Sequence, residues 1–411
     1  MELKNEWIQE DDVYENPLLK ITLNGLKYYG ILLYKTQPLK KLNCFRGVVF
    51  TASMLAFNVT QYIDLYQVWG NIGDMTANAA TTLLFTTTIV RIFHFYGNRT
   101  RFNNAIKYAD EGVQHVLRFG MPAEKAIFWQ NVKYMQRLTA VFWICALVTA
   151  NTMCIYALIQ YLSNTVEEPA TILRSWYPAE NMEKHFLVLY CIQLYIMYVG
   201  QLIVPCWHVF MVSLMVYVRT SLMILNHKLA HMDEYVASGM RSGRKPQVVK
   251  DPTEESYATR RELIIECIQQ QRKVYGYTIE LEDLIKGAVF MDFVVFSVLL
   301  CALLFEASVT DSMVQIFIDI SYILTMTAIL FLYYWHANEM QHQANLLSKS
   351  TFMSDWYNYP RVVNRHLITL ICYCNRPLTM KAFFLPMSLD TFIAILRASY
   401  SYFTILKQAA D

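Results

Sequence analysis

The sequence is poor in charge. Asp, Glu, Lys and Arg make up 17% of its 411 residues, whereas soluble domains carry about 25%. Hydrophobic residues make up 55% and extend over the whole length, which excludes a disordered chain and disfavours a water-soluble globule. The net charge of +2 indicates no nucleic-acid surface. The composition predicts a polytopic α-helical membrane protein.

The motifs of common catalytic sites are also missing. No serine lies in Gly-x-Ser-x-Gly, and neither GxxxxGK[ST] nor GxGxxG occurs, so no nucleophile elbow or phosphate loop is indicated. His336, Glu339 and His342 recur every three residues, which is not the i, i+4 histidine spacing of a zinc helix. A solvated or interfacial helix face is the favoured interpretation. We predict no enzyme, no cofactor and no metal site.

Long apolar segments dominate instead. A bilayer crossing needs about 20 apolar residues, and seven segments qualify, one of them interrupted by Pro205. The predicted spans are Phe45–Trp69, Met75–Tyr96, Leu138–Leu162, Phe186–Val218, Gly287–Phe305, Val314–Trp335 and Phe384–Leu406.

The segment before the first span is apolar but short. Residues 18–34 carry Lys20 and Lys27, and we interpret them as an interfacial or re-entrant helix lying against the bundle. An eighth span is the alternative, but it would translocate the lysines of 35–44. The first sixteen residues are acidic, so no secretory signal is expected.

Basic residues alternate between the connecting segments. Four segments are rich in Lys and Arg, while 70–75 and 306–313 have none and 163–185 is mainly acidic. The positive-inside rule then places the N-terminus in the cytoplasm and the C-terminus outside. The predicted organisation is a cytoplasmic N-terminus (1–44), spans one to four (45–218), cytoplasmic extensions (219–286), spans five and six (287–335), cytoplasmic helices (336–383), and the last span with a short tail (384–411).

Three spans continue beyond the bilayer as helical patterns. Residues 219–232 extend span four, 259–286 lead into span five, and 336–347 extend span six. Residues 237–256 are rich in Gly, Pro, Ser and charge, which predicts a flexible linker. Amphipathic extensions need a surface to pack on, so we predict a cytoplasmic anchor domain where subunits meet. Packing within one monomer is the alternative.

Polar residues recur on one face of the last span. Asp390 and Arg397 are seven residues apart, and Gln408 follows eleven later, so all three share a helix face. Ionisable groups within a span are costly and usually functional. The functional interpretation is a pore-lining helix, and the alternative is salt bridging between helices of one subunit.

The outer halves of spans two, three, four and six are apolar and aromatic with scattered polar groups. A cavity there suits a small, mostly apolar ligand with one polar group, and ordinary helix packing is the alternative. By helix face and depth, the predicted ligand-binding residues are Thr81, Phe85, Asn151, Cys154, Leu158, Tyr190, Leu194, Ile320, Tyr322 and Ile323.

A set of short motifs lies in the last third of the chain. They are Ser354-Asp355-Trp356-Tyr357, Asn375-Arg376-Pro377-Leu378, Lys381-Ala382, Phe392 and the run from Ala398 to Leu406. In this order they resemble the insect odorant receptor family, which ends its last span in a run like Tyr-Ser-(Tyr/Phe)-Phe-Thr and carries an Arg-Pro-Leu element before it.

The resemblance implies an odorant-gated, non-selective cation channel in the plasma membrane of sensory dendrites. Family members are tetramers whose last helix lines the pore, and a tuning subunit assembles with a co-receptor. The short linker fits a tuning subunit in such a heterotetramer. By resemblance, Ile405 is the hydrophobic gate, Gln408 the polar ring at the outer mouth, and Tyr402 a further pore residue. Ala409 stands where the family has Leu, so the constriction differs there.

Three other classes remain as alternatives. A gustatory-receptor-like channel shares the topology but takes soluble tastants. A seven-helix G-protein-coupled receptor places its N-terminus outside, against the loop charges, and no NPxxY occurs in the last span. A secondary transporter usually shows internal repeats, and no repeat is seen.

Overall fold

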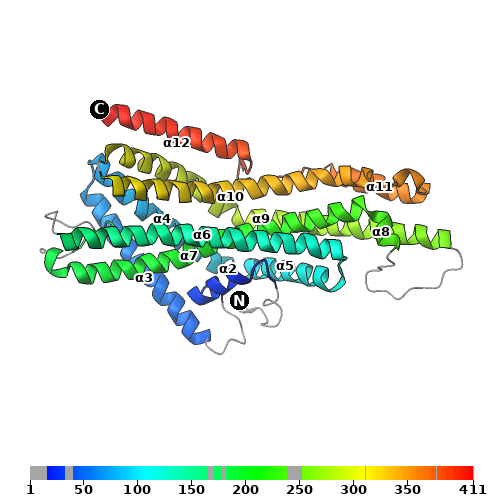
Figure 1. The fold of residues 1–411 in the computed structure, drawn as a ribbon, viewed down its shortest axis with the longest axis horizontal. Helices are drawn as coiled ribbons and strands as arrows, with labels where there is room; N and C mark the ends of the chain where they lie inside the picture. Colours follow the sequence, from blue (N-terminus) through cyan, green and yellow to red (C-terminus); the bar gives the residue numbers. More distant parts are fainter. Residues whose placement is uncertain are drawn as a thin grey trace, which may run out of the picture.

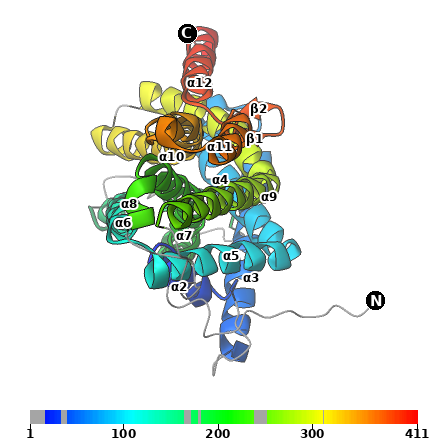
Figure 2. The same ribbon diagram turned by 90° about the vertical axis from the view of Figure 1, so that its right-hand side faces the viewer.

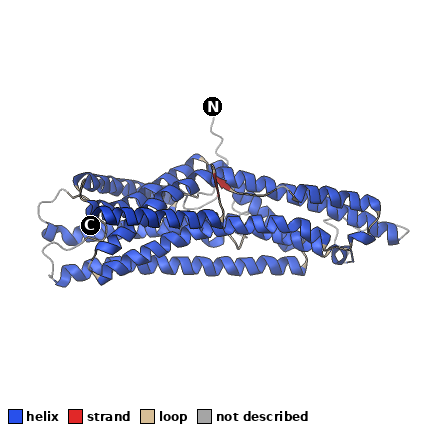
Figure 3. Cartoon of the chain, turned by 90° about the horizontal axis from the view of Figure 1, so that it is seen from above, coloured by secondary structure: helices blue, strands red, loops and turns tan. Residues whose placement is uncertain are grey.

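The computed structural model is an elongated bundle made almost wholly of helices (Figures 1 and 3). It describes residues 16–32, 40–163, 171–177, 182–237, 252–310, 312–375 and 377–410. The helices are α2 (Lys20–Tyr29), α3 (Lys40–Gln67), α4 (Ile72–Gly97), α5 (Arg99–Phe119), α6 (Pro122–Ser163), α7 (Met182–Ala230), α8 (Met232–Ala237), α9 (Pro252–Val309), α10 (Met313–Phe352), the 3₁₀ helix η1 (Trp356–Asn358), α11 (Arg361–Cys374) and α12 (Leu389–Ala410). Strands β1 (Lys381–Ala382) and β2 (Leu385–Pro386) form a small hairpin.

Each predicted span corresponds to one long helix: α3, α4, α6, α7, α9, α10 and α12. Within the described residues, α3, α6, α7, α9 and α10 are long and apolar enough to cross a bilayer on those criteria alone. Helices α4 and α12 are not among these five; α4 carries Asp74 and Arg91, and α12 carries Asp390, Arg397 and Lys407. The all-helical membrane fold is therefore confirmed, and its two polar helices need protein or water beside them.

The start of the last span was placed five residues too early. Phe384 lies in the turn of the β1–β2 hairpin, and α12 begins only at Leu389. Pro386 lacks an amide donor, so it fits a strand end better than a helix interior. The Ser388 Oγ then accepts a hydrogen bond from the Thr391 amide at 3.4 Å, as an N-cap does.

Three helices continue well past their predicted spans, as expected. Helix α7 runs on to Ala230, α10 runs on to Phe352, and α9 begins at Pro252 before its span. Figure 1 shows these extensions beside α8 and α11 at one end of the bundle. A buried stripe holds the α9 extension in place through Ile264, Cys267, Gln271, Val274 and Thr278. Most of the predicted linker, 238–251, lies outside the described residues, and its last five residues belong to α9.

The short N-terminal helix lies against the bundle. Helix α2 packs on α7 and α3, and its Leu19, Leu26 and Tyr29 are fully buried. A Cβ atom at Gly25 would collide with the Cys206 sulfur, so glycine permits this close crossing. Gly30, with φ of 93°, ends the helix in the left-handed conformation.

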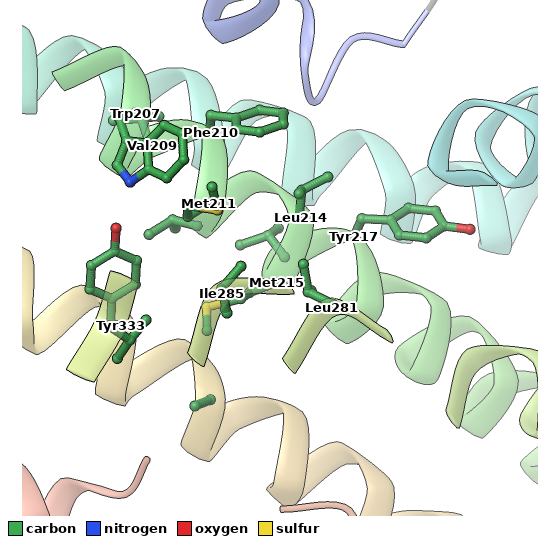
Figure 4. Packing of buried hydrophobic residues seen from close by; sticks show 14 of the residues in the cluster. Trp207, Val209, Phe210, Met211, Leu214, Met215, Tyr217, Leu281, Ile285 and Tyr333 are labelled. Carbon is green, nitrogen blue, oxygen red and sulfur yellow. The ribbon is translucent and has the colours of Figure 1, made fainter. Parts of the chain in front are cut away.

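Helix α7 is the central column of the molecule. It packs against α2, α3, α6, α9 and α10, and Figure 2 shows it surrounded by other helices. Figure 4 shows Trp207, Phe210 and Leu214 of α7 packed near Ile285 of α9 and Tyr333 of α10. From Cys206 to Val218 nearly every side chain of α7 is buried, so this part of the apolar helix is covered by its neighbours on all sides.

Candidate functional site

A cavity lies among the four helices that the sequence predicted, with one residue from α3 and one from the α6–α7 loop. It is mostly apolar, and its free volume is about 70 Å³. The lining residues are Met54, Leu84, Phe85, Thr88, Phe142, Ala146, Thr149, Met153, Leu173, Met197, Gly200, Gln201, Val204, Pro205, Tyr322, Thr325, Met326 and Ile329.

Two residues of α7 make room for this cavity. Gly200 has no side chain, and a Cβ atom there would stand 3.6 Å from the Phe85 ring. Pro205 lies inside the helix, where its ring removes one backbone hydrogen bond and bends the axis. The cavity therefore opens where α7 cannot pack as tightly as it does below.

The cavity wall is adaptable. Four of its residues are methionines: Met54, Met153, Met197 and Met326. Methionine is unbranched and has three rotatable bonds, so it re-packs around different shapes. The free volume of about 70 Å³ is below the roughly 300–1,000 Å³ of typical ligand sites. A ligand must therefore displace these flexible side chains.

The polar groups of the lining are few and mostly engaged. The hydroxyls of Thr88, Thr149 and Thr325 donate to backbone carbonyls of their own helices at 2.8, 3.0 and 2.8 Å. Their oxygens keep lone pairs that face the cavity as acceptors. Gln201 and Tyr322 add an amide and a phenol to the lining. The site thus suits an apolar molecule with one group able to hydrogen-bond.

Residues 171–177 close the outer end of the cavity. Leu173 reaches the lining, and the Gln193 side chain holds its backbone, accepting from the amide at 3.0 Å and donating to the carbonyl at 2.7 Å. Arg174 is paired with Asp74 at 2.5 Å and Asp64 at 3.2 Å. The covering segment is thus anchored to α3, α4 and α7.

Only two of the ten predicted ligand-binding residues, Phe85 and Tyr322, line the cavity. Four others connect helices: Thr81 accepts from Gln61 at 3.0 Å, Asn151 accepts from the Tyr198 hydroxyl at 2.7 Å, and the Tyr190 hydroxyl donates to the Cys154 carbonyl at 3.2 Å. Ile320 is on the outer surface. Leu158, Leu194 and Ile323 are part-buried and outside the lining.

The cavity lies one to two helical turns deeper than most of the predicted ligand-binding residues. On α6 its lining runs from Phe142 to Met153, and on α7 from Met197 to Pro205. The outer ends are occupied by the 171–177 segment, whose inward packing no periodicity signals. Pro205, already visible as an interruption of span four, is at the depth of this cavity.

A polar layer lies directly beneath the cavity. Arg91, one turn below Thr88, forms an ion pair with Asp292, and both side chains are almost fully buried. His208 Nδ1 is 2.7 Å from the Tyr333 hydroxyl. The layer joins α4 to α9 and α7 to α10.

Helix α12 packs through one face only and lies at the edge of the subunit (Figures 1 and 2). Ile395 and Ser399 are buried, and the Ser399 hydroxyl donates to the Ser297 carbonyl of α9 at 3.3 Å. Phe392 packs edge-on against Phe331 of α10, with 5.7 Å between ring centroids.

The predicted pore residues of α12 are exposed, although Tyr402, seven residues after Ile395, is on the same side of the helix as the packed residues. Tyr402 and Ile405 are 63% and 60% exposed, and Asp390, Arg397 and Gln408 are also exposed. The side chain of Ala409 lies outside the described residues. Within one subunit, these exposed side chains have little protein cover among the described residues.

Ionic clusters hold the far end of the bundle together. Lys228 contacts Glu124 at 3.4 Å and Glu266 at 3.5 Å. Arg260 contacts Asp233 at 2.7 Å, and the Tyr359 hydroxyl donates to the same carboxylate at 3.2 Å. Burial, aided by Asp233, raises the pKa of Tyr359 to about 12. The phenol therefore stays a hydrogen-bond donor at neutral pH.

Comparison with known proteins identifies the family. The family model described as 7tm Odorant receptor matches residues 71–400. The chain belongs to the insect odorant receptor family. The receptor is 26% identical to odorant receptor 56a of Drosophila melanogaster over 409 residues, covering 96% of each chain. It is 23% identical to odorant receptor Or2 of Anopheles gambiae over 384 residues, covering 90% of this chain and 94% of that one.

Solved structures show the same fold. The olfactory receptor OR5 of Machilis hrabei superposes on the receptor with a TM-score of 0.77 and 14% identity, covering 97% of this chain and all of that one. Its complex with eugenol gives a TM-score of 0.75, covering 95% and 96%. These matches confirm a multi-pass membrane receptor, and they give no support to the gustatory or G-protein-coupled alternatives.

Proposed function

We propose that this receptor is the odorant-binding subunit of a ligand-gated, non-selective cation channel. The observation that carries the proposal is the covered, methionine-lined cavity, which borders α10, one of the two helices on which α12 packs. A ligand that enlarges the cavity displaces its lining side chains and presses on α10. Movement of α10 reaches α12 through the Phe331–Phe392 contact.

The ligand is a small volatile molecule that is mainly apolar and carries one hydrogen-bonding group. Each Å² of apolar surface removed from water contributes about 25 cal/mol. A molecule burying roughly 200 Å² therefore gains about 5 kcal/mol before the costs of binding. Only the difference in affinity between closed and open states drives gating. The OR5 structure with eugenol supports this ligand class.

The exposed face of α12 is the pore lining in this proposal. A ring of Ile405 side chains from several subunits closes the conduit by excluding water. Gln408 and Ala409 form its outer mouth, and Tyr402 lies one turn further in. Separation of the α12 helices by a small distance would wet the ring and admit cations.

The assembly is a heterotetramer with odorant receptor co-receptor subunits. It lies in the plasma membrane of sensory dendrites, with the N-terminus in the cytoplasm and the extended helices forming the anchor domain between subunits. The alternation of basic segments supports this orientation.

The test is a panel of volatiles applied to cells that express the receptor with and without a co-receptor. We expect odorant-evoked cation currents only with both chains. Failure of every volatile in the panel at verified surface expression would contradict the ligand assignment. Large odorant currents from this chain alone would contradict the need for a co-receptor.

A matched pair of variants tests the cavity itself. Ala146→Phe fills it from a buried position on α6, whereas Ala140→Phe adds the same group at an exposed position on that helix. We expect Ala146→Phe to raise the half-maximal odorant concentration about tenfold or more, since a loss of about 1.4 kcal/mol in binding free energy is enough for that change. Ala140→Phe should leave the half-maximal concentration unchanged. Equal responses of both variants would rule the cavity out as the binding site.

A further inference from the structure

A second hollow lies on the membrane side of the cavity, between α6 and α10. It is an open, almost wholly apolar groove with a free volume of about 500 Å³. Its lining residues are Leu138, Val141, Phe142, Ile144, Cys145, Val148, Thr149, Ser321, Leu324, Thr325, Ala328, Phe331 and Leu332. All of them fall within predicted spans three and six, so the groove lies at the depth of the hydrocarbon of the bilayer.

The groove and the cavity share a wall that is one side chain thick. Phe142, Thr149 and Thr325 line both hollows. Phe142 is 7% exposed, and the two threonines flank the same seam between α6 and α10. A rotamer change of these side chains is therefore enough to join the two spaces.

Polar side-chain pairs join α6 and α10 near the two ends of their contact, which we call the seam. The Tyr156 hydroxyl is 3.4 Å from Ser312 Oγ at one end, and the Tyr134 hydroxyl is 3.3 Å from His336 Nε2 at the other. Between these pairs, the described residues of α6 and α10 meet by apolar packing. Thr149 and Thr325 donate to carbonyls of their own helices. The seam can thus part without breaking a hydrogen bond between helices.

The other way into the cavity, past residues 171–177, is held closed by several hydrogen bonds and ion pairs. To pass residues 171–177, a ligand must displace Leu173, whose amide and carbonyl are both bonded to Gln193. Arg174 adds ion pairs to Asp64 and Asp74, and the Trp176 amide donates to the Thr60 carbonyl at 3.2 Å. Buried polar groups that lose their hydrogen-bond partners destabilise the protein.

We infer that an apolar volatile reaches the cavity from within the bilayer, with the α6–α10 groove as its vestibule and Phe142, Thr149 and Thr325 as the partition. This inference rests on the proposed odorant-binding function. An apolar molecule concentrates in the bilayer because its transfer out of water is favourable. The groove, with a free volume of about 500 Å³, has room for a small volatile molecule. To pass from the groove into the cavity, the molecule crosses a single layer of side chains.

Kinetics distinguish an access route from a binding contact. A route alters the rates of association and dissociation by the same factor, so the equilibrium affinity stays the same. Ala328→Trp obstructs the groove at a residue that does not line the cavity, and Leu324→Ala widens it. Ala140→Trp is the matched control, because Ala140 is exposed on α6 and lines neither hollow.

The measurement is current onset and washout after rapid odorant application, at concentrations where the onset rate rises linearly with odorant. We expect Ala328→Trp to slow both rates at least about threefold and Leu324→Ala to speed both, with half-maximal concentrations within about twofold of the unmodified receptor. Ala140→Trp should match the unmodified receptor.

Each outcome is decisive. Unchanged rates in both groove variants would overturn the lateral route while leaving odorant gating intact. A change in the half-maximal concentration without a change in rates would make the groove a regulatory lipid or ligand site instead, which also overturns the route. If the Ala328→Trp receptor does not reach the cell surface, the onset and washout rates of Leu324→Ala alone decide whether the groove is the access route. An unmodified receptor that never responds to odorants contradicts the proposed function itself.

Discussion

Removal of one member of the buried Arg91–Asp292 pair should destabilise the receptor much more than removal of both. The two side chains are 2% and 1% exposed. Arg91 Nε and Nη1 and Asp292 Oδ2 have no hydrogen-bond partner among the described residues, so the pair is incompletely satisfied. A buried pair of this kind contributes little net stability, but an uncompensated buried charge is costly.

The magnitudes follow from what each variant leaves behind. Asp292→Leu leaves the Arg91 guanidinium, which does not lose its proton in proteins, so the cost is about 3–5 kcal/mol. That cost corresponds to a factor of roughly 10²–10⁴ in the folded population. Arg91→Met leaves a carboxyl that can bind a proton and become neutral, so its loss is smaller. The double variant replaces the pair by apolar groups and should recover most of the loss.

The assay is the fraction of monodisperse, detergent-purified receptor that survives heating, scanned at one fixed rate because membrane proteins rarely refold. We expect the thermal midpoint to be lowest for Asp292→Leu and intermediate for Arg91→Met. The midpoint of the double variant should be close to that of the unmodified receptor. Asp283→Leu is the control, since Asp283 pairs with Arg101 at 2.5 Å where both side chains are 47% exposed, and its midpoint should not move.

Two results would refute the reasoning. A double variant as unstable as Asp292→Leu would show that the pair contributes something that apolar packing cannot replace. An Asp292→Leu midpoint equal to that of Asp283→Leu would show that Asp292 is not buried against an unneutralised charge.

Three further predictions concern topology, pore and cover. An epitope at the C-terminus should be stained on unpermeabilised cells, and staining only after permeabilisation would contradict the orientation. Substitution of Ile405 by Ala or Gln408 by Glu should change basal conductance or cation selectivity in voltage-clamp recordings; unchanged permeation in both would exclude α12 from the pore. Gln193→Leu should lower the thermal midpoint, because the amide and carbonyl of Leu173 lose their partner at a cost of about 1–3 kcal/mol; the exposed Gln136→Leu should not.

The candidate site was only partly accessible to sequence reasoning. The cavity lies among the four helices that the sequence indicated, since an outer half that is apolar with scattered hydroxyls differs from a lipid-facing surface. Of the predicted residues, Phe85 and Tyr322 line it, because they lie at its shallow edge. Gly200 and the four methionines were missed, because single residues of these types carry no period that marks a cavity.

The membrane helices follow from the sequence by itself. Backbone amides and carbonyls cannot remain unpaired in hydrocarbon, so each apolar run of about 20 residues must become a helix. The continuation of α7, α9 and α10 beyond the bilayer was visible for a related reason, since amphipathic periodicity persisted after the apolar run ended. Both rules act within one segment and need no knowledge of its neighbours.

Only the tertiary structure decided the depth of the cavity, its cover and the ion pair beneath it. Arg91 and Asp292 are 201 residues apart in sequence, and the cover packs inward because Gln193 satisfies the backbone of Leu173. Such contacts depend on how helices rotate and slide against one another. Many residue pairs would satisfy the same local pattern, and only the packing of the whole bundle selects among them.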